Sequence, residues 1–160
     1  MLIHGASGGV GGFAVQLARA RGAHVIGTAS AANLGLVREL GAHEAIDAAT
    51  PFDDAVDLVD LVFDTAGGER LRRSVAVLSA SGQAVSVAEK PPDGGVYFIV
   101  EPNCDQLTSI ARLADGGVLP PPSIDVFPLA SAREAFARSV EPRRPGKVGL
   151  AVAGIHPDGT

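Results

Sequence analysis

The stretch that decides the fold of this chain is HGASGGVGG, residues 4–12. A short apolar run precedes it and an amphipathic segment over residues 13–21 follows it, so the local order is strand, glycine turn and helix. Counted from Ala6, the turn has the pattern A-x-G-x-x-G, which places Gly8 and Gly11 at the second and third glycine positions of a dinucleotide-binding turn. The first position holds alanine in place of the usual glycine.

The small residues of this turn suit a bound dinucleotide. Gly8 allows backbone amides to approach a pyrophosphate, and Gly11 allows the helix to pack close to the strand. The helix N-terminus then offers free N–H groups and the positive end of a dipole to the phosphates. The strand before the turn and the helix after it favour this interpretation over a glycine turn without a ligand. The predicted contacts in this stretch are Ala6, Ser7, Gly8, Gly9, Val10 and Gly11.

Five motifs in order extend the pattern along the chain: IHGASGGVGGFAVQLAR, VIGTAS, ELGAHEAID, DLVFDTAGGE and RPGKVGL. With them, the chain from Met1 to about Val152 resembles the cofactor-binding domain of the zinc-independent quinone oxidoreductases, in the medium-chain dehydrogenase/reductase superfamily. The resemblance implies a two-domain, NAD(P)H-dependent reductase of quinones, enones or related carbonyl compounds. In that family a catalytic domain precedes this region, whereas Met1 here sits at the first strand. We therefore expect the chain to lack the N-terminal catalytic domain.

Length and composition narrow the class of protein. A chain of 160 residues with 46% apolar residues suits a globular fold with a sizeable core. The net charge of -5 argues against nucleic acid or an anionic membrane as a partner, and the resemblance implies a small-molecule substrate. One cysteine, Cys104, excludes an internal disulfide, and no apolar run approaches the length of a membrane span. No signal peptide is visible, so we expect a cytoplasmic protein.

Strand and helix signals alternate, which predicts an α/β fold of the Rossmann type, a doubly wound parallel sheet with helices on both faces. The proline run at 120–122 divides the chain. We expect a Rossmann dinucleotide-binding domain over 1–119, a short C-terminal strand-helix-strand remnant over 120–152 and a tail over 153–160. The predicted strands are 1–4, 24–28, 45–47, 58–64, 83–87, 96–100, 124–127 and 147–152, and the predicted helices are 13–21, 32–40, 69–78, 105–114 and 131–139.

Two local patterns refine the helices. On the first helix, Val10, Phe13, Ala14, Leu17 and Ala18 fall on one face, which we expect to be buried. On the last helix, the sequence S-x-x-E over residues 131–134 predicts a capping box.

The end of the second strand bears on the choice of cofactor. A domain that prefers NAD places an acidic residue about 20 positions beyond the fingerprint, where it holds the ribose 2′-hydroxyl. Here that region is Thr28-Ala29-Ser30, without an acid, so a 2′-phosphate meets no repulsion. Thr28, Ser30 and Asn33 are the predicted contacts, and NADPH is favoured over NADH. The alternative for Ser30 is a helix cap.

Further site residues follow from the strand ends. Asp64 to Gly68 ends the fourth strand, and open α/β sheets bind ligands outside the carboxyl edge of the sheet. The resemblance implies that Thr65, Ala66 and Gly67 lie along the nicotinamide ribose, that Val87, Phe98 and Val100 lie near the nicotinamide ring, and that Lys147 lies near the cofactor. The alternatives are a glycine turn before a helix and a surface lysine.

No catalytic residue or metal site is assigned. The four histidines and the single cysteine show no metal-ligand spacing, and Ser7 and Ser86 have no evident histidine and aspartate partners. Three functions stay open: an NADPH-binding domain of a quinone or enone reductase, a truncated reductase repurposed for a redox-neutral cyclisation or isomerisation, and a non-catalytic binding module or half of a split enzyme whose catalytic domain is a separate chain. The apolar segment Val96–Val100 indicates a sheet edge, and the resemblance implies a homodimer through it.

Overall fold

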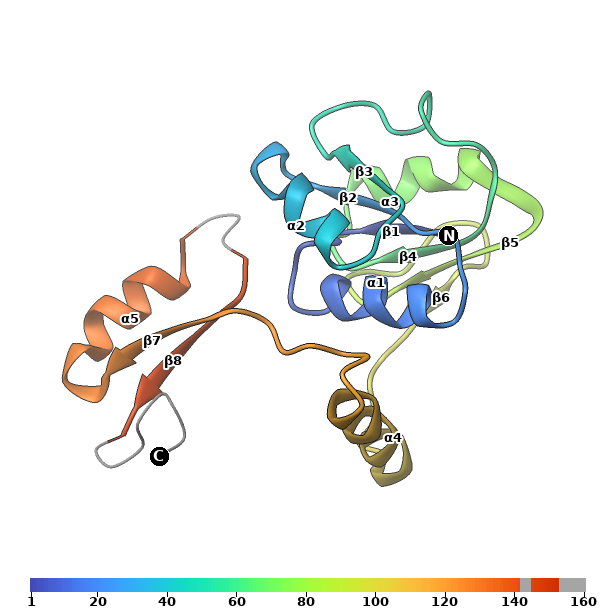
Figure 1. Ribbon diagram of the computed structural model, residues 1–160. Helices are drawn as coiled ribbons and strands as arrows, with labels where there is room; N and C mark the ends of the chain where they lie inside the picture. The colour runs from blue at the N-terminus through green and yellow to red at the C-terminus, as the bar shows by residue number, and fades with distance from the viewer. Residues whose placement is uncertain (142–144, 153–160) are drawn as a thin grey trace. The chain divides into compact units, whose positions relative to one another are not determined.

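The computed structural model describes residues 1–141 and 145–152, and the predicted tail over 153–160 lies outside them. The chain divides into two compact units, of which the first is Met1–Pro120 and the second begins at Pro121. Among the described residues, the first unit contains a six-stranded sheet, and the second contains a two-stranded sheet with one α-helix (Figure 1).

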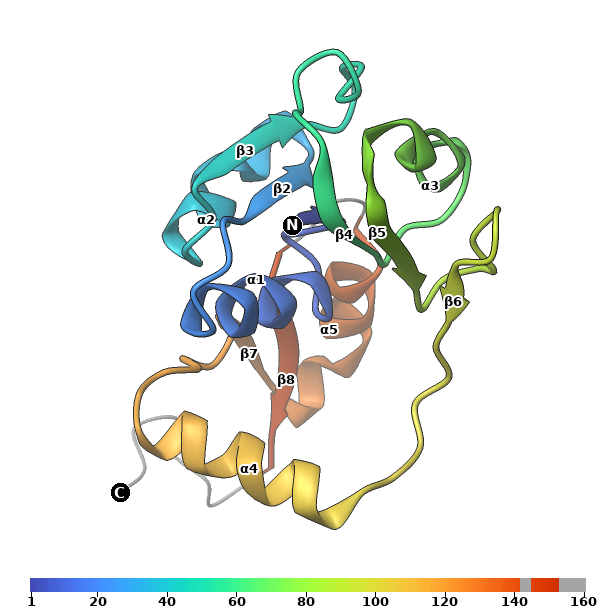
Figure 2. The same ribbon diagram turned by 90° about the vertical axis from the view of Figure 1, so that its right-hand side faces the viewer.

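The larger sheet confirms the predicted Rossmann-type doubly wound fold. Its strand order is β3-β2-β1-β4-β5-β6, every neighbouring pair is parallel, and Figure 2 shows the strands in this order from left to right. The order reverses between β1 and β4, which is where such sheets bind ligands. The strands are β1 Leu2–His4, β2 Ile26–Ala29, β3 Glu44–Asp47, β4 Val59–Asp64, β5 Leu78–Ser86 and β6 Val96–Tyr97. The helices are α1 Gly11–Ala20, η1 Ala31–Asn33, α2 Leu34–Glu39, α3 Glu69–Arg73, η2 Ser74–Val77 and α4 Cys104–Asp115.

Each face of this sheet has its own apolar core, because successive strand residues point to opposite sides. Ile3 packs with Val15 of α1 and Val37 of α2 on one face. Its neighbour Leu2 packs on the other face with a cluster that includes Phe52. Both strand residues are fully buried. Phe52 lies between the predicted strands over 45–47 and 58–64, where the sequence predicted neither helix nor strand, yet it belongs to the core.

The first helix buries only part of the face that the sequence predicted, since Ala18 is buried and Ala14 packs against the core. Its buried residues are Gly11, Gly12, Val15, Gln16 and Ala18, whereas Val10 is exposed. The first turn of α1 lies against the backbone of the preceding turn at Gly11, where a Cβ atom would lie 2.1 Å from the carbonyl oxygen of Gly5.

Several other elements differ from the predicted bounds, among them β5, which begins at Leu78, five residues before the predicted strand over 83–87. The predicted helix over 69–78 tightens into a 3-10 turn at Ser74, whose hydroxyl donates to the carbonyl oxygen of Arg70 at 2.8 Å. Such back-bonding and the β-branched valines after it disfavour continuation as an α-helix. The sixth strand ends at Tyr97, although the N–H of Phe98 still donates to the carbonyl oxygen of Ser86 at 2.8 Å.

The second unit is a strand-helix-strand. Its elements are β7 Ile124–Pro128, η3 Leu129–Ser131, α5 Ala132–Ser139 and β8 Lys147–Ala151, and the two strands pair in parallel. Arg138 of α5 donates to the carboxylate of Asp125 at 2.8 Å, which fastens the helix to β7. The predicted capping box is wrong, because Ser131 forms no cap bond. A 3-10 turn already leads into α5, so Ser131 has a φ of -95° and a ψ of 24° and lacks the extended conformation of an N-cap.

Two features concern the described residues as a whole. None of the helices among residues 1–141 and 145–152 is long and apolar enough to cross a membrane. Over the same ranges, histidine, cysteine, aspartate and glutamate form no group of three or more that could hold a metal ion.

Candidate functional site at the carboxyl edge of the sheet

The glycine turn after β1 requires glycine at two positions. Gly5 has a φ of 72°, and a Cβ atom there would lie 2.3 Å from the hydroxyl oxygen of Thr65. At Gly11 a Cβ atom would lie 2.1 Å from the carbonyl oxygen of Gly5. Gly5 therefore supplies the tight turn that the alanine at Ala6 does not. Sequence reasoning missed this residue because the fingerprint was counted from the next position.

This turn leaves backbone donors open toward solvent. The N–H of Gly8 donates to the carbonyl oxygen of Gly5 at 2.9 Å, and the N–H of Gly12 donates to that of Gly8 at 2.8 Å. Among the described residues, the N–H groups of Gly9 and Val10 have no acceptor, and both residues are exposed. They precede the ten-residue helix α1, whose N-terminus carries the positive end of the dipole. The arrangement fits an anion such as a pyrophosphate.

The end of β2 contains an unsatisfied hydroxyl. The Oγ of Ser30 is buried and has no hydrogen-bond partner among the described residues. It makes no cap bond to the following turn, so the alternative that Ser30 caps the second helix is wrong. The amide of Asn33 donates to the hydroxyl of Ser7 at 3.4 Å, which links this strand end to the glycine turn. Because buried polar atoms seldom lack partners, the Ser30 hydroxyl suits a ligand group.

His4 is a buried polar residue that the sequence did not single out. Its Nδ1 lies 2.9 Å from the hydroxyl of Thr28, and its Nε2 lies 2.7 Å from the hydroxyl of Ser74. The Ser74 hydroxyl hydrogen is used on Arg70, so Nε2 of His4 carries the proton and Nδ1 accepts from Thr28. Burial lowers the pKa of His4 to about 4, against a smaller opposite effect of the Asp64 charge. The imidazole is therefore neutral, and the Thr28 hydroxyl is engaged within the fold.

The carboxyl ends of β4 and β5 are joined by a buried network. The carboxylate of Asp64 accepts hydrogen bonds from the N–H groups of Ala66 and Gly67 and from the hydroxyl of Ser86. The Ser86 oxygen accepts in turn from the N–H groups of Ala88 and Glu89, at 3.0 and 3.2 Å. This network sets the backbone of both turns that follow the strands. The hydroxyl of Thr65 also donates to the carbonyl oxygen of His4 at 2.8 Å.

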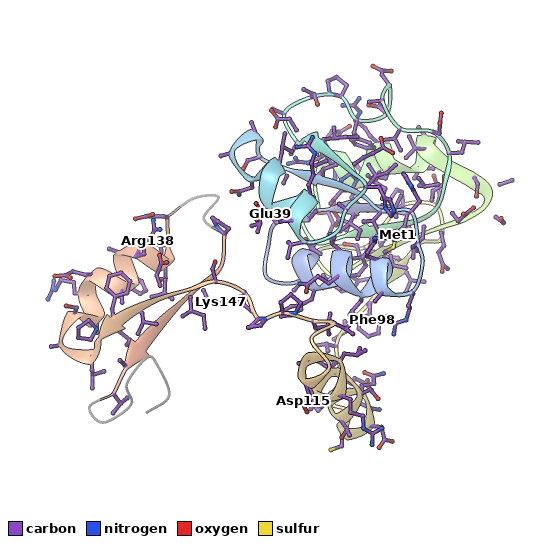
Figure 3. All side chains as sticks on the ribbon, in the orientation of Figure 1. Met1, Glu39, Phe98, Asp115, Arg138 and Lys147 are labelled. Carbon is purple, nitrogen blue, oxygen red and sulfur yellow. The ribbon has the colours of Figure 1, made fainter. Side chains whose placement is uncertain are left out.

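The structure gathers most of the predicted site residues at one edge of the sheet. Residues 6–11, Ser30 and Asn33 follow β1 and β2, while residues 65–67 and Val87 follow β4 and β5. Phe98 joins β5 through its backbone but its side chain is exposed, and Val100 lies three residues beyond the end of β6 with 80% exposure. Lys147, which is labelled in Figure 3, is the first residue of β8 in the second unit. A contact of Lys147 with the cofactor therefore stays a prediction.

Comparison with known proteins identifies the class. The family model for zinc-binding dehydrogenase matches residues 9–111, more than half of the chain, and the chain belongs to this family. With its parallel sheet and glycine turn, it is a quinone oxidoreductase-like cofactor-binding domain of the medium-chain dehydrogenase/reductase superfamily.

Three relatives illustrate the match. The NADPH-dependent alkenal/one oxidoreductase of Arabidopsis thaliana chloroplasts is 33% identical over 92% of this chain and 39% of its own length. The polyketide synthase GfsB of Streptomyces halstedii is 34% identical over all of this chain and 3% of its own length. The structure of the quinone oxidoreductase from Coxiella burnetii superposes with a TM-score of 0.83, at 29% identity, over 94% of this chain and 52% of that one. This chain thus spans about half or less of each relative's length.

Proposed function

We propose that this chain binds NADPH and forms the cofactor-binding part of a reductase of quinones or of carbon–carbon double bonds conjugated to a carbonyl group. The observation that carries the proposal is the pairing of open amides at the start of α1 with the unpartnered hydroxyl of Ser30. A dinucleotide with a 2′-phosphate matches both, since the amides suit its pyrophosphate and the hydroxyl suits the phosphate on its adenosine ribose. The Arabidopsis relative, which its name describes as NADPH-dependent, supports this cofactor.

The residues of this chain would bind and orient the cofactor. The amides of Gly9 and Val10 would hold the pyrophosphate, and Ser30 with Asn33 would contact the 2′-phosphate. Thr65 to Gly67 and Val87 border the place where the nicotinamide end would lie, and the bound nicotinamide supplies a hydride in such reactions. Because Asp64 and Ser86 fix these two turns by buried hydrogen bonds, little backbone ordering is left to occur on binding.

Calorimetric titration with NADPH tests this proposal. In Gly8→Val the two added methyl groups would cover the amides, so we expect the heat of NADPH binding to disappear. Gly35→Val is the matched control, because Gly35 lies in α2 with open space around it. Binding that survives the change at Gly8, or that the change at Gly35 removes equally, would count against a cofactor at the glycine turn.

A second candidate substrate class comes from the polyketide synthase relative, which matches the whole chain. For that candidate we propose an α,β-unsaturated acyl thioester as the compound whose double bond is reduced. Oxidation of NADPH with a crotonyl thioester, with a simple enone and with a quinone, each as the only acceptor, separates the two classes. Preferential turnover of the thioester favours the second candidate, and preferential turnover of the quinone or enone favours the first. A product formed without NADPH oxidation would favour the redox-neutral alternative.

A further inference from the structure

Glu89 lies in the loop after β5, beside the turn that follows β4. A Cβ atom at Gly67 would lie 3.3 Å from both Cδ and Oε2 of Glu89, so the carboxylate rests against the backbone of that turn. Its own N–H donates to Ser86, within the network that joins the two strand ends. No sequence pattern singled out this residue, because its neighbours along the chain form an ordinary polar loop.

One oxygen of this carboxylate is engaged and the other is open. Oε1 accepts from the N–H of Gly68 at 3.0 Å and lies 3.5 Å from Nη1 of Arg72. Within the described residues, no hydrogen bond reaches Oε2. The side chain is 42% exposed, so a ligand from solvent has access to it. The contacts on Oε1 hold Oε2 in one place beside Gly67.

The charge of Glu89 is compatible with an anionic dinucleotide nearby. Arg72 offsets it, and the same guanidinium also pairs with Glu69 at 3.0 Å on the surface of α3. A carboxylate with a free oxygen is a strong acceptor for a sugar hydroxyl. Acidic residues of Rossmann domains bind a ribose hydroxyl in this way at the adenosine end of the cofactor.

We propose that Glu89 binds the nicotinamide-side ribose of the cofactor, with Oε2 accepting a hydrogen bond from a ribose hydroxyl. The assignment rests on the proposed function, in which the nicotinamide end of the cofactor lies beside Thr65 to Gly67. With Glu89 in this role, an acidic residue contacts the ribose at the nicotinamide end of the cofactor. At the adenosine end, the segment Thr28 to Ser30 contains no acidic residue. Arg72 and Gly68 act through Glu89 and position it.

The test compares two ligands by calorimetry. NADPH contains the nicotinamide ribose, whereas 2′,5′-ADP contains only the adenosine half. Glu89→Ala should weaken NADPH binding about tenfold, the loss expected for one charge-assisted hydrogen bond, and should leave the affinity for 2′,5′-ADP unchanged. Glu89→Gln keeps the shape and an acceptor for Gly68 but loses the charge, so a smaller loss of about threefold is expected.

Glu69→Ala is the matched control, because it removes the other carboxylate of Arg72 and leaves the Gly67 turn untouched. We expect it to change neither affinity. Unchanged NADPH affinity in Glu89→Ala, or an equal loss for both ligands, would overturn the assignment while leaving the proposed function in place. If the unaltered chain bound neither ligand, the proposed function would fail and the role of Glu89 with it.

Discussion

The hydroxyl of Ser86 donates to the carboxylate of Asp64 at 2.7 Å, and both side chains are fully buried. Each residue ends a strand, β5 for Ser86 and β4 for Asp64. Both also accept hydrogen bonds from backbone N–H groups of the turn that follows their own strand. One side-chain pair therefore fixes two of the turns that border the candidate site.

Removal of this hydroxyl should destabilise the fold. Ser86→Ala leaves the Asp64 carboxylate and two amides short of a partner, for which we expect a loss of about 2 kcal/mol in the free energy of unfolding, measured in urea. Ser79→Ala is the control, since Ser79 donates to Asp60 at 3.1 Å at an exposed position and should lose less than about 0.5 kcal/mol. Equal losses in the free energy of unfolding for the two variants would show that the buried pair stabilises the fold no more than the exposed one.

His4 makes stability depend on pH. Burial lowers its pKa from 6.5 to about 4, so the unfolded chain takes up this proton more readily than the folded chain. The free energy of unfolding therefore depends on the neutral state of His4. This contribution is fully present above about pH 6.5, and as the pH falls toward 4 up to about 3 kcal/mol of it is lost. Urea unfolding across this interval should show the fall, and His4→Gln should flatten it. A variant whose stability falls as steeply as that of the unaltered chain would contradict the neutral buried histidine.

The glycine turn should tolerate a methyl group at one position and not at another. Gly11→Ala places Cβ 2.1 Å from a backbone oxygen, which forces α1 away from the turn and should cost about 3 kcal/mol. Gly8→Ala meets its nearest atom at 3.2 Å and should cost less than about 1 kcal/mol. Thermal unfolding of the two variants measures the difference. Similar melting temperatures would mean that the helix does not depend on this close approach.

The edge of the sheet beyond β6 should mediate a homodimer. β6 is the last strand in the sheet order, and Phe98 and Ile99 after it are 51% and 70% exposed. Light scattering at micromolar concentration should give twice the mass of the chain, and Phe98→Lys combined with Ile99→Pro should give a monomer. Leu107→Lys on α4 is the control, because this residue is equally exposed but lies outside the edge. A monomeric unaltered chain, or a dimer that survives the double substitution, would contradict a dimer through residues 96–100.

The sequence was sufficient for a parallel sheet of the Rossmann type and for the strand ends that form the candidate site. Glycine turns and apolar runs are local signals, and they predicted the strand-turn-helix at residues 4–12 and the glycine turn after Asp64. His4 gave no such signal, since its partners Thr28 and Ser74 are 24 and 70 positions away. Glu89 was missed for the same reason, because it meets Gly68 across 21 positions. Contacts of this kind depend on strand register, which short-range patterns do not contain.

Local signals also led to errors where the tertiary structure decides. The pattern S-x-x-E at Ser131 satisfied the rule for a capping box, but the preceding 3-10 turn gives Ser131 the wrong backbone conformation. Phe52 lies in a loop, as its polar and proline neighbours indicated, but no local signal marked it as a core residue. It is nonetheless 1% exposed, with its ring 4.8 Å from that of His4.

The central claim, that this chain binds NADPH at the ends of β1 and β2, is tested most directly by titrating the unaltered chain and Ser30→Asp with NADPH and with NADH. We predict tighter binding of NADPH by the unaltered chain, because no acid repels the 2′-phosphate. We predict tighter binding of NADH by Ser30→Asp, because the new carboxylate accepts from the ribose hydroxyl and repels the phosphate. Titration at about millimolar concentration still detects binding free energies near -4 kcal/mol. If the unaltered chain bound neither nucleotide under these conditions, the claim that it binds NADPH would be contradicted.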